Sequence, residues 1–254
     1  MKGIIIMYTE TAHEFLSRLG KQILRPGGKK GTNFLLKHTK ISASSNVLEV
    51  ACNQGETLIK LYKKYKCNIV GVDNNQHFIN LAQSNIKRKM LGKKIGLLCC
   101  DAEKMPFMDN SIDIIITQAM LTMLSDDKFK LVLKEYFRIL KPGGLLLTHD
   151  LVIYDNSLIN QLRSLTLVPV NPKHPKEWKK LFILNDFSIK RELIGKMNLI
   201  NPLGLLCNEG FNTLKILRNG LKKENKKRFK QLYSFFNKNR KKLGFICLIN
   251  EKPR

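Results

Sequence analysis

The fold is indicated first by a short stretch early in the chain, Val47-Leu-Glu-Val-Ala-Cys-Asn-Gln-Gly55. Its apolar half is typical of a buried strand, and the amphipathic spacing from Gly55 to Tyr65 predicts a helix. The small residue Ala51 and the glycine Gly55 let the connecting backbone approach a ligand closely. Glu49 places a carboxylate inside the apolar strand, where it needs a partner because burying an unpaired charge is costly. The stretch therefore predicts a strand, a ligand-binding turn and a helix.

The same alternation continues along the chain. We expect strands at 46–51, 67–73, 94–100, 112–117 and 145–151, with helices at 55–65, 75–91 and 126–140. Two short helices precede them at 10–20 and 32–40, and helices at 155–165, 175–184, 203–218 and 222–242 follow, with strands at 187–194 and 244–250. Apolar strands that alternate with amphipathic helices predict an α/β fold, in which a largely parallel sheet is covered on both faces.

Two further strands end in acids. Asp73 follows Gly55 by 18 positions and is well placed to accept hydrogen bonds from both ribose hydroxyls of a nucleoside cofactor. The alternative is that Asp73 or Asn74 caps the next helix, and both roles are compatible. Asp101 ends the third strand, where its carboxylate can accept a hydrogen bond from an exocyclic amine such as adenine N6.

Together these segments, in this order and at these spacings, resemble the class I S-adenosylmethionine (SAM)-dependent methyltransferases, and most nearly the type 11 group that includes quinone-biosynthesis methyltransferases. The segment Leu140-Lys-Pro-Gly-Gly144 fits as well, because that family commonly has such a turn before its fifth strand. The resemblance covers roughly residues 40–152. It implies a Rossmann-like seven-stranded sheet of order 3-2-1-4-5-7-6 with strand 7 antiparallel, helices on both faces and extra C-terminal helices.

The resemblance also implies a cofactor, SAM, and a set of contacts. These are Glu49, Ala51, Cys52, Asn53 and Gly55 around the methionine end, Asp73 and Asn74 at the ribose, Asp101 and Ala102 at the adenine, and Gln118 and Ala119 near the sulfonium. One departure is that Ala51 and Asn53 occupy positions where the family usually has glycine. Alanine is tolerable at position 51 where φ is negative, and asparagine tolerates a positive φ at position 53, so we expect the loop to form. The dinucleotide fingerprint G-x-G-x-x-G is absent, which disfavours a dehydrogenase.

The implied domain organisation is one methyltransferase domain over residues 1–254. It comprises an N-terminal helical lid (1–40), a SAM-binding core (41–152), and a C-terminal part (153–254) that completes the sheet and covers the substrate. In the lid, Arg25-Pro-Gly-Gly-Lys-Lys30 is either a basic surface turn or a cover that brings Arg25 near a carboxylate.

Methyl transfer from a sulfonium is an in-line displacement that depends on positioning and on exclusion of water. A general base helps only where the acceptor loses a proton. Candidates are His149 and Tyr154 around the end of the fifth strand, with His13 and Asp150 as further possibilities. His149 is alternatively a structural residue. Thr117-Gln-Ala-Met120 stands where enzymes that methylate adenine or glutamine amines have N/D-P-P-Y/F, so that class is disfavoured.

The acceptor class is less constrained. With 45 Lys and Arg against 20 Asp and Glu, the net charge of +25 makes RNA, acidic membranes and anionic metabolites all candidate partners. The alternative is that most lysines are simply solvated, as in a Lys-, Asn- and Ile-rich chain from a genome poor in G and C. Residues 222–242 mix basic residues with Phe229, Tyr233, Phe235 and Phe236, which fits nucleic-acid binding but better fits an amphipathic helix over a pocket.

We therefore expect a small-molecule methyltransferase, with an RNA methyltransferase or a non-catalytic SAM-binding protein as alternatives. The sequence sets no oligomeric state. The six cysteines form no C-x-x-C pair, so no metal site is expected, and free thiols suit a cytoplasmic location. No apolar run approaches the ~18 residues of a membrane span. The segment Met1–Met7 is too short for a signal-peptide core, and Met7 is an alternative start that would make residues 1–6 an extension.

Overall fold

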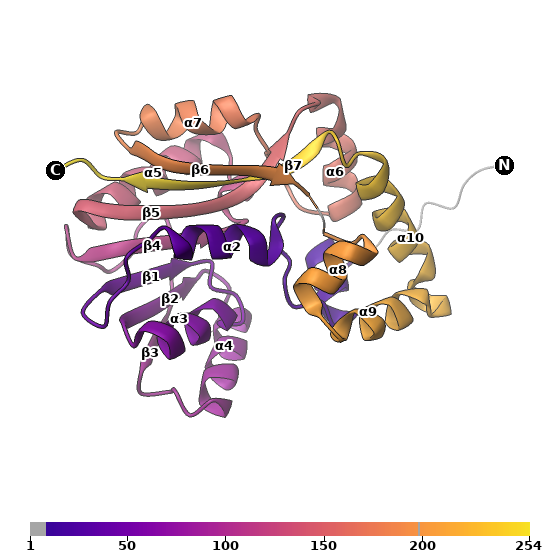
Figure 1. Cartoon of the computed structure of the whole chain (residues 1–254), viewed down its shortest axis with the longest axis horizontal. Helices are drawn as coiled ribbons and strands as arrows, with labels where there is room; N and C mark the ends of the chain where they lie inside the picture. Colours follow the sequence, from indigo (N-terminus) through magenta and orange to yellow (C-terminus); the bar gives the residue numbers. More distant parts are fainter. Residues whose placement is uncertain (1–8, 198) are drawn as a thin grey trace.

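A computed structural model of the chain describes residues 9–197 and 199–254. Within these residues seven strands form one sheet, and helices cover both of its faces (Figure 1). The strands are β1 (Asn46–Val50), β2 (Asn68–Asp73), β3 (Ile95–Cys99), β4 (Ile112–Gln118), β5 (Leu140–Ile153), β6 (Ser188–Lys196) and β7 (Leu243–Glu251). The α-helices are α1 (Ala12–Arg18), α2 (Gly28–Lys37), α3 (Glu56–Tyr65), α4 (Gln76–Arg88), α5 (Asp126–Ile139), α6 (Ile159–Thr166), α7 (Pro175–Ile183), α8 (Pro202–Glu209), α9 (Asn212–Leu221) and α10 (Lys223–Lys238), and the short 3₁₀ turns are η1 (Leu121–Met123) and η2 (Asn156–Leu158).

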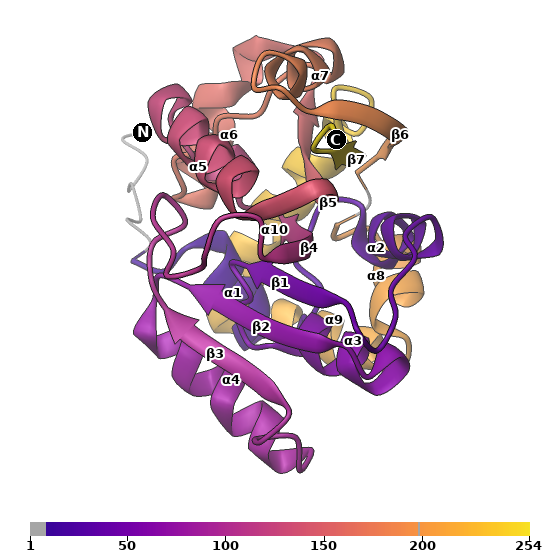
Figure 2. The same cartoon turned by 90° about the vertical axis from the view of Figure 1, so that its left-hand side faces the viewer.

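The strand order is β3-β2-β1-β4-β5-β7-β6, which confirms the predicted topology. Strands β1 to β5 run parallel to one another, and β7 runs antiparallel to both β5 and β6. The carboxyl ends of the parallel strands therefore meet at one edge, where an open α/β sheet binds its ligands. Figure 2 shows the twist of the sheet from β3 to β6.

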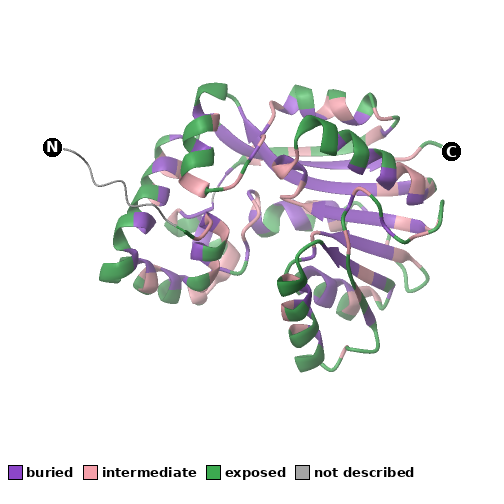
Figure 3. Cartoon of the chain, turned by 180° about the vertical axis from the view of Figure 1, so that it is seen from behind, coloured by how far each residue is buried: buried purple, intermediate pink, exposed green. Residues whose placement is uncertain are grey.

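Alternate residues of the strands face opposite layers, because successive side chains of a strand point to opposite faces. Leu48 and Val50 of β1 pack in the same hydrophobic cluster as buried residues of α5 and α7. Val47, one residue before Leu48, packs with residues of α2, α3 and α4 on the other face. The near-continuous apolar strands in the middle of the sheet, such as β1, β4 and β7, are thus explained by burial on both sides, whereas the edge strands β3 and β6 are largely exposed (Figure 3).

A third cluster lies beyond the ends of the strands. It joins apolar residues of α1, α6, α8, α9 and α10 to Leu151 and Ile153 of β5 and to Leu243 of β7. We call these five helices the helical cover. In Figure 1 they lie to one side of the sheet, at the end of the molecule opposite the C-terminus. None of the helices in the described residues is long and apolar enough to cross a membrane.

Three expected elements differ from the structure. β5 begins at Leu140, not at 145, because Leu140 already pairs with Ile112 and the segment after it bulges before regular pairing resumes at Ile114. The helix expected at 203–218 is two helices, α8 and α9, separated at Gly210, whose φ of 58° ends α8. Helix α2 begins at Gly28 instead of position 32. The expectations for residues 1–7 fall outside the described residues.

Candidate functional site

The turn after β1 has left-handed backbone at three positions. Ala51 has φ 57°, Asn53 has φ 49° and Gly55 has φ 76°, and Gly55 is the N-cap of α3. The loop forms as expected, but not with the negative φ at which alanine is readily tolerated: it keeps the backbone that glycines would favour although position 51 carries a Cβ. Such a conformation costs an alanine about 1–2 kcal/mol. Asn53 adopts the positive φ that asparagine tolerates.

Asp73 ties this turn to the end of β2. Its Oδ2 accepts a hydrogen bond from the Asn53 N–H at 3.0 Å, and its Oδ1 accepts one from the Asn75 N–H at 3.0 Å. The side chain that caps α4 is Asn75, whose Oδ1 accepts from the His77 N–H, so neither Asp73 nor Asn74 takes that role. Each oxygen of the buried Asp73 carboxylate keeps acceptor capacity for a ribose hydroxyl.

The other predicted donor-site residues lie around the same edge. Asp101 is exposed, and its Oδ1 accepts from the Glu103 N–H at 3.0 Å, while Ala102 is buried beside it. Cys52 is buried under the turn, and burial raises the pKa of its thiol far above the usual range. Asn74 is exposed at the end of β2. The structure thus brings the predicted positions of β1, β2 and β3 to one edge of the sheet.

Buried polar groups without partners converge behind the turn. Glu49 Oε2, Gln118 Nε2 and Arg25 Nε are all buried with no hydrogen-bond partner in the described residues. Burial raises the pKa of Glu49 to about 7, and the nearby Arg25 guanidinium opposes that rise. Burial also lowers the pKa of Arg25, and the negative charge of Glu49 opposes that decrease. Arg25 therefore lies near a carboxylate, as expected if the turn 25–30 covers the site and is not merely a basic surface turn.

These orphaned groups fit the methionine end of SAM. A buried carboxyl group suits an ammonium, and a buried guanidinium suits a carboxylate, so Glu49 and Arg25 are complementary to the two charges of an amino acid. Gln118 is held in place because its Oε1 accepts from the Thr32 hydroxyl at 2.6 Å, which leaves its Nε2 free to donate. Unsatisfied buried polar atoms are rare in folded proteins and call for a partner.

His149 is fully buried between α2 and the sheet. Its Nε2 accepts a hydrogen bond from the Gly27 N–H at 3.0 Å, which places the ring proton on Nδ1, 3.5 Å from Gln118 Oε1. Burial, aided by the Arg25 cation, lowers the pKa of His149 to about 3, so the ring is neutral. Because the Gly27 N–H occupies the lone pair of Nε2, His149 cannot take a proton from a methyl acceptor. The geometry therefore favours a positioning role for His149 over the catalytic role expected from the sequence.

The other candidates at the end of β5 also lie apart from an acceptor site. Tyr154 is about half exposed and packs edge-on against the ring of His174 at 5.5 Å. Asp150 is buried, and its Oδ1 accepts from the N–H and the hydroxyl of Thr122, each at 3.0 Å. Burial raises the pKa of Asp150 to about 6. Asp150 therefore fixes η1, the turn that follows Ala119.

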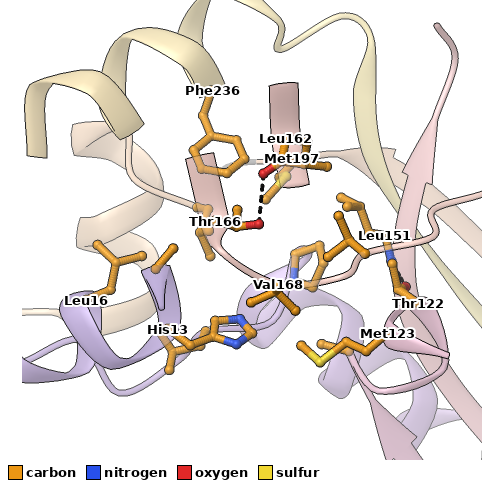
Figure 4. Close-up of a pocket in the computed structure, with 16 residues that line it drawn as sticks. His13, Leu16, Thr122, Met123, Leu151, Leu162, Thr166, Val168, Met197 and Phe236 are labelled. Atoms are coloured by element: carbon orange, nitrogen blue, oxygen red, sulfur yellow. Dashed lines mark hydrogen bonds between the residues drawn. The ribbon is translucent and has the colours of Figure 1, made fainter. Parts of the chain in front are cut away.

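An apolar cavity opens between η1, the helical cover and the connection from α1 to α2. Its empty volume is about 620 Å³, including the open mouth. It is lined almost entirely by apolar side chains, and these include Ala119, Met123, Leu151, Leu162, Val168 and Phe236. Figure 4 shows the lining residues converging from α1, α6, α10 and η1. Ala119, the position expected beside the sulfonium, thus lies in the wall of this cavity.

His13 is the polar side chain of this cavity that stays unused. Thr166 donates its hydroxyl to the Leu162 carbonyl, and Thr122 is engaged with Asp150. No described residue forms a hydrogen bond with the His13 ring, which lies across the cavity from Phe236 (Figure 4). Burial lowers the pKa of His13, so its imidazole is neutral at neutral pH and available as a proton acceptor.

Comparisons with known proteins agree with this geometry. A family model described as a methyltransferase domain matches residues 47–144. An uncharacterised protein from Haemophilus influenzae is 43% identical over 247 residues, which cover 96% of this chain and 98% of that protein. A demethylmenaquinone methyltransferase from Lactobacillus johnsonii is 36% identical over 110 residues, or 42% of this chain and 44% of that enzyme. The chain belongs to the class I SAM-dependent methyltransferases.

A solved structure supports the fold over nearly the whole chain. The phosphoethanolamine N-methyltransferase 2 of Haemonchus contortus, bound to phosphomonomethylethanolamine and S-adenosylhomocysteine, superposes with a TM-score of 0.75 and 16% identity. The match covers 98% of this chain and 59% of that one. This likeness shows the fold, and the family to which the chain belongs uses SAM as its cofactor. The match to the demethylmenaquinone enzyme spans less than half of that relative.

Several residues of the methyltransferase site escaped the motif search. Thr32 orients Gln118 from a segment 86 positions earlier, and Gly27 binds His149 across 122 positions. Met197 and Leu199 enter the cavity wall from the connection before α8. Thr32, Met197 and Leu199 are residue types that carry no chemical signal by themselves, and the sequence marked Gly27 only as part of the basic turn 25–30.

Proposed function

We propose that this methyltransferase transfers the methyl group of SAM to a small, largely apolar acceptor that binds in the cavity beside Ala119. The observation that carries the proposal is the composition of the cavity, in which an apolar wall meets the expected position of the sulfonium. Small-molecule sites are concave and mostly apolar, with few polar groups that set orientation. A nucleic-acid site would instead require an open basic groove.

We assign the donor contacts as the resemblance implied. Glu49 and Arg25 hold the amino acid end, Gln118 donates from Nε2, Asp73 accepts from the ribose and Asp101 with Ala102 flanks the adenine. The orphaned atoms of Glu49, Gln118 and Arg25 support this arrangement. When bound, SAM supplies an electrophilic methyl group.

His13 is the proposed proton acceptor where the acceptor must lose one. A nucleophilic oxygen, nitrogen or carbon of the acceptor forms a bond to the methyl carbon, the carbon–sulfur bond breaks with its electron pair moving to sulfur, and the acceptor proton passes to His13. The neutral, unpartnered imidazole in the cavity wall supports this role. The apolar surroundings exclude water from the displacement.

The aromatic residues of α10 weigh against RNA as the acceptor. Phe229 and Phe235 are buried in the helical cover, and Phe236 lines the cavity. Their rings are therefore packed inward and do not form a platform on which bases could stack.

The test separates the donor and acceptor sites. SAM binding is measured by calorimetry, and methyl transfer is then measured with labelled SAM on a panel of apolar metabolites and on total RNA. Val168→Trp, which fills the cavity, should lower kcat/KM for the acceptor while leaving the SAM Kd unchanged. His13→Gln should lower kcat by about a hundred-fold or more for an acceptor that loses a proton.

Absence of SAM binding by the folded protein would contradict the donor assignment. RNA methylation that Val168→Trp leaves intact would contradict the acceptor assignment. A full rate with His13→Gln across the pH range would remove the proposed proton transfer while leaving the cavity assignment standing.

A further inference from the structure

Helices α8 and α9 expose large apolar side chains that nothing in the described chain covers. Leu203 is 76% exposed, Phe211 98% and Leu214 74%, and Leu206 and Leu221 are also more than half exposed. Single exposed leucines are ordinary, whereas several together on adjoining helices mark an interaction surface. We call Leu203, Leu206, Phe211, Leu214 and Leu221 the docking face. α8 and α9 lie at the end of the molecule away from the sheet (Figure 1).

Basic residues surround the docking face. Lys215, Arg218 and Lys222 line the same shallow surface hollow as Phe211 and Leu214. Over residues 199–242 there are 12 Lys and Arg against two acids, Glu209 and Glu224. Glu209 is fully buried and paired with Lys21, so it adds almost no negative potential at the surface.

We propose that the docking face binds the surface of an anionic lipid bilayer, with its apolar side chains in the interface and the basic residues at the phosphates. A helix that combines apolar and basic side chains binds at the boundary between headgroups and acyl chains. Anionic lipids attract nearby basic residues. A second copy of the chain would bring the same cations against one another, which is unfavourable. RNA would satisfy the cations but leave the leucines without a partner.

The docking face lies on the same group of helices as the wall of the acceptor cavity. The helical cover that carries it also walls the acceptor cavity, through Phe236 of α10 and through Met197 and Leu199 immediately before α8. A bilayer held at α8 and α9 therefore lies next to elements that line an apolar cavity. Docking would bring the enzyme to the phase in which an apolar acceptor dissolves.

The experiment is co-sedimentation of the full chain with phosphatidylcholine vesicles, with and without phosphatidylglycerol. It requires neither SAM nor an acceptor, so its result is independent of the proposed function. We expect binding that depends on phosphatidylglycerol and weakens with added salt. Lys215→Gln with Arg218→Gln should weaken binding about thirty-fold, the equivalent of about 2 kcal/mol for two basic residues at an anionic surface. Phe211→Ser with Leu214→Ser should weaken it about ten-fold or more, because their apolar burial is lost.

Matched variants control for exposure and charge elsewhere. Ile183→Ser with Leu184→Ser removes two apolar side chains that are 60% and 66% exposed near the end of α7. Lys60→Gln with Lys63→Gln removes two exposed charges of α3. Neither pair should change the binding more than about two-fold. The proposal is overturned if the chain does not sediment with either vesicle, if the control pairs weaken binding as much as the docking-face pairs, or if light scattering shows a dimer that the docking-face substitutions dissociate.

Discussion

At the scale of single residues, Ala51 adds backbone strain to the turn after β1. Its φ of 57° is one that glycine adopts freely and alanine does not. Replacing Ala51 by glycine relieves the left-handed strain, which stabilises the folded state by about 1–2 kcal/mol. The greater conformational entropy of glycine in the unfolded chain lowers the stability by about 0.5–1 kcal/mol. We therefore predict that Ala51→Gly raises the free energy of unfolding by about 0.5–1 kcal/mol, measured by urea denaturation.

A helical alanine provides the control for that prediction. Ala82 is fully buried within α4, where the same replacement should destabilise the protein by about 1 kcal/mol or more. If Ala51→Gly proves as destabilising as Ala82→Gly, the left-handed conformation at position 51 stores no strain.

Glu49 should couple SAM binding to pH. Burial raises the pKa of its carboxyl to about 7 from 4.5, so the folded apo protein holds this proton more tightly than the unfolded chain does. The apo protein accordingly loses stability as pH rises from about 4.5 to 7. An ammonium bound at Glu49 favours the charged form and lowers that pKa. We predict that SAM binding near pH 6 releases a proton and that SAM affinity falls about ten-fold for each pH unit below the apo pKa.

Calorimetry in buffers of different ionisation enthalpy measures the number of protons released. Glu49→Gln, which keeps the shape and cannot titrate, should bind SAM without releasing a proton and with a flat pH dependence. Equal proton release by the wild type and by Glu49→Gln would rule out Glu49 as the linked group.

At the scale of elements, two glycines determine how closely α2 packs on the sheet. A Cβ at Gly31 would lie 2.4 Å from His149 Cε1 and 2.8 Å from Cys247 Sγ, and one at Gly27 would lie 2.6 Å from His149 Nε2. We predict that Gly31→Ala destabilises the fold by about 1–3 kcal/mol through overpacking and weakens SAM binding, because α2 also carries Thr32. Urea denaturation and SAM titration measure the two effects.

His149→Ser removes the imidazole ring and leaves room for the methyl group of Gly31→Ala. The double variant should therefore lose less free energy of unfolding than the sum of the losses of the two single variants. Gly92 supplies the matched control, since a Cβ there meets nothing within 4 Å and Gly92→Ala should leave both quantities unchanged within about 0.5 kcal/mol. Strict additivity of the two changes would contradict the packing argument.

The elements themselves could be predicted to different extents. Strands β1 to β4 were found within one residue or two because each is an apolar run bounded by polar residues. The start of β5 was missed because Pro142, Gly143 and Gly144 indicate a turn, whereas tertiary pairing extends the strand: Leu140 pairs with Ile112, and the Gly143 N–H donates to the Lys252 carbonyl. Local chemistry cannot reveal pairing with segments that are distant in the sequence, such as the one around Lys252.

At the scale of the whole molecule, the sequence leads to the proposed donor contacts but not to the proposed acceptor cavity. The proposed donor contacts follow successive strand ends, whose positions the parallel topology determines. The acceptor cavity combines His13 of α1, Val168 after α6 and Phe236 of α10, which only the packing of the helical cover brings together. His13 was considered from the sequence, but its place in the cavity depended on that packing.

A buried ion pair that attaches the segment after α1 to the end of α8 gives a prediction for the whole fold. Lys21 Nζ and Glu209 Oε1 are 3.1 Å apart, with side chains 0% and 1% exposed, and Glu209 also accepts from the N–H groups of Gln22 and Ile23. Removing one charge leaves the other buried and unpaired, which costs about 3–5 kcal/mol. We predict losses of that size in the free energy of unfolding for Lys21→Met and for Glu209→Leu.

Lys21→Met combined with Glu209→Leu should lose less than the sum by about 1–3 kcal/mol, because no unpaired charge remains buried. The exposed pair Lys242–Asp155, 2.7 Å apart, is the control: Lys242→Met should cost at most about 1 kcal/mol. Because Glu209 ends α8 and Lys21 follows α1, the single variants should also loosen the helical cover around the cavity and raise the KM of the proposed acceptor. Single variants as stable as the wild type would mean that water reaches this pair and that it does not hold α1 and α8 together.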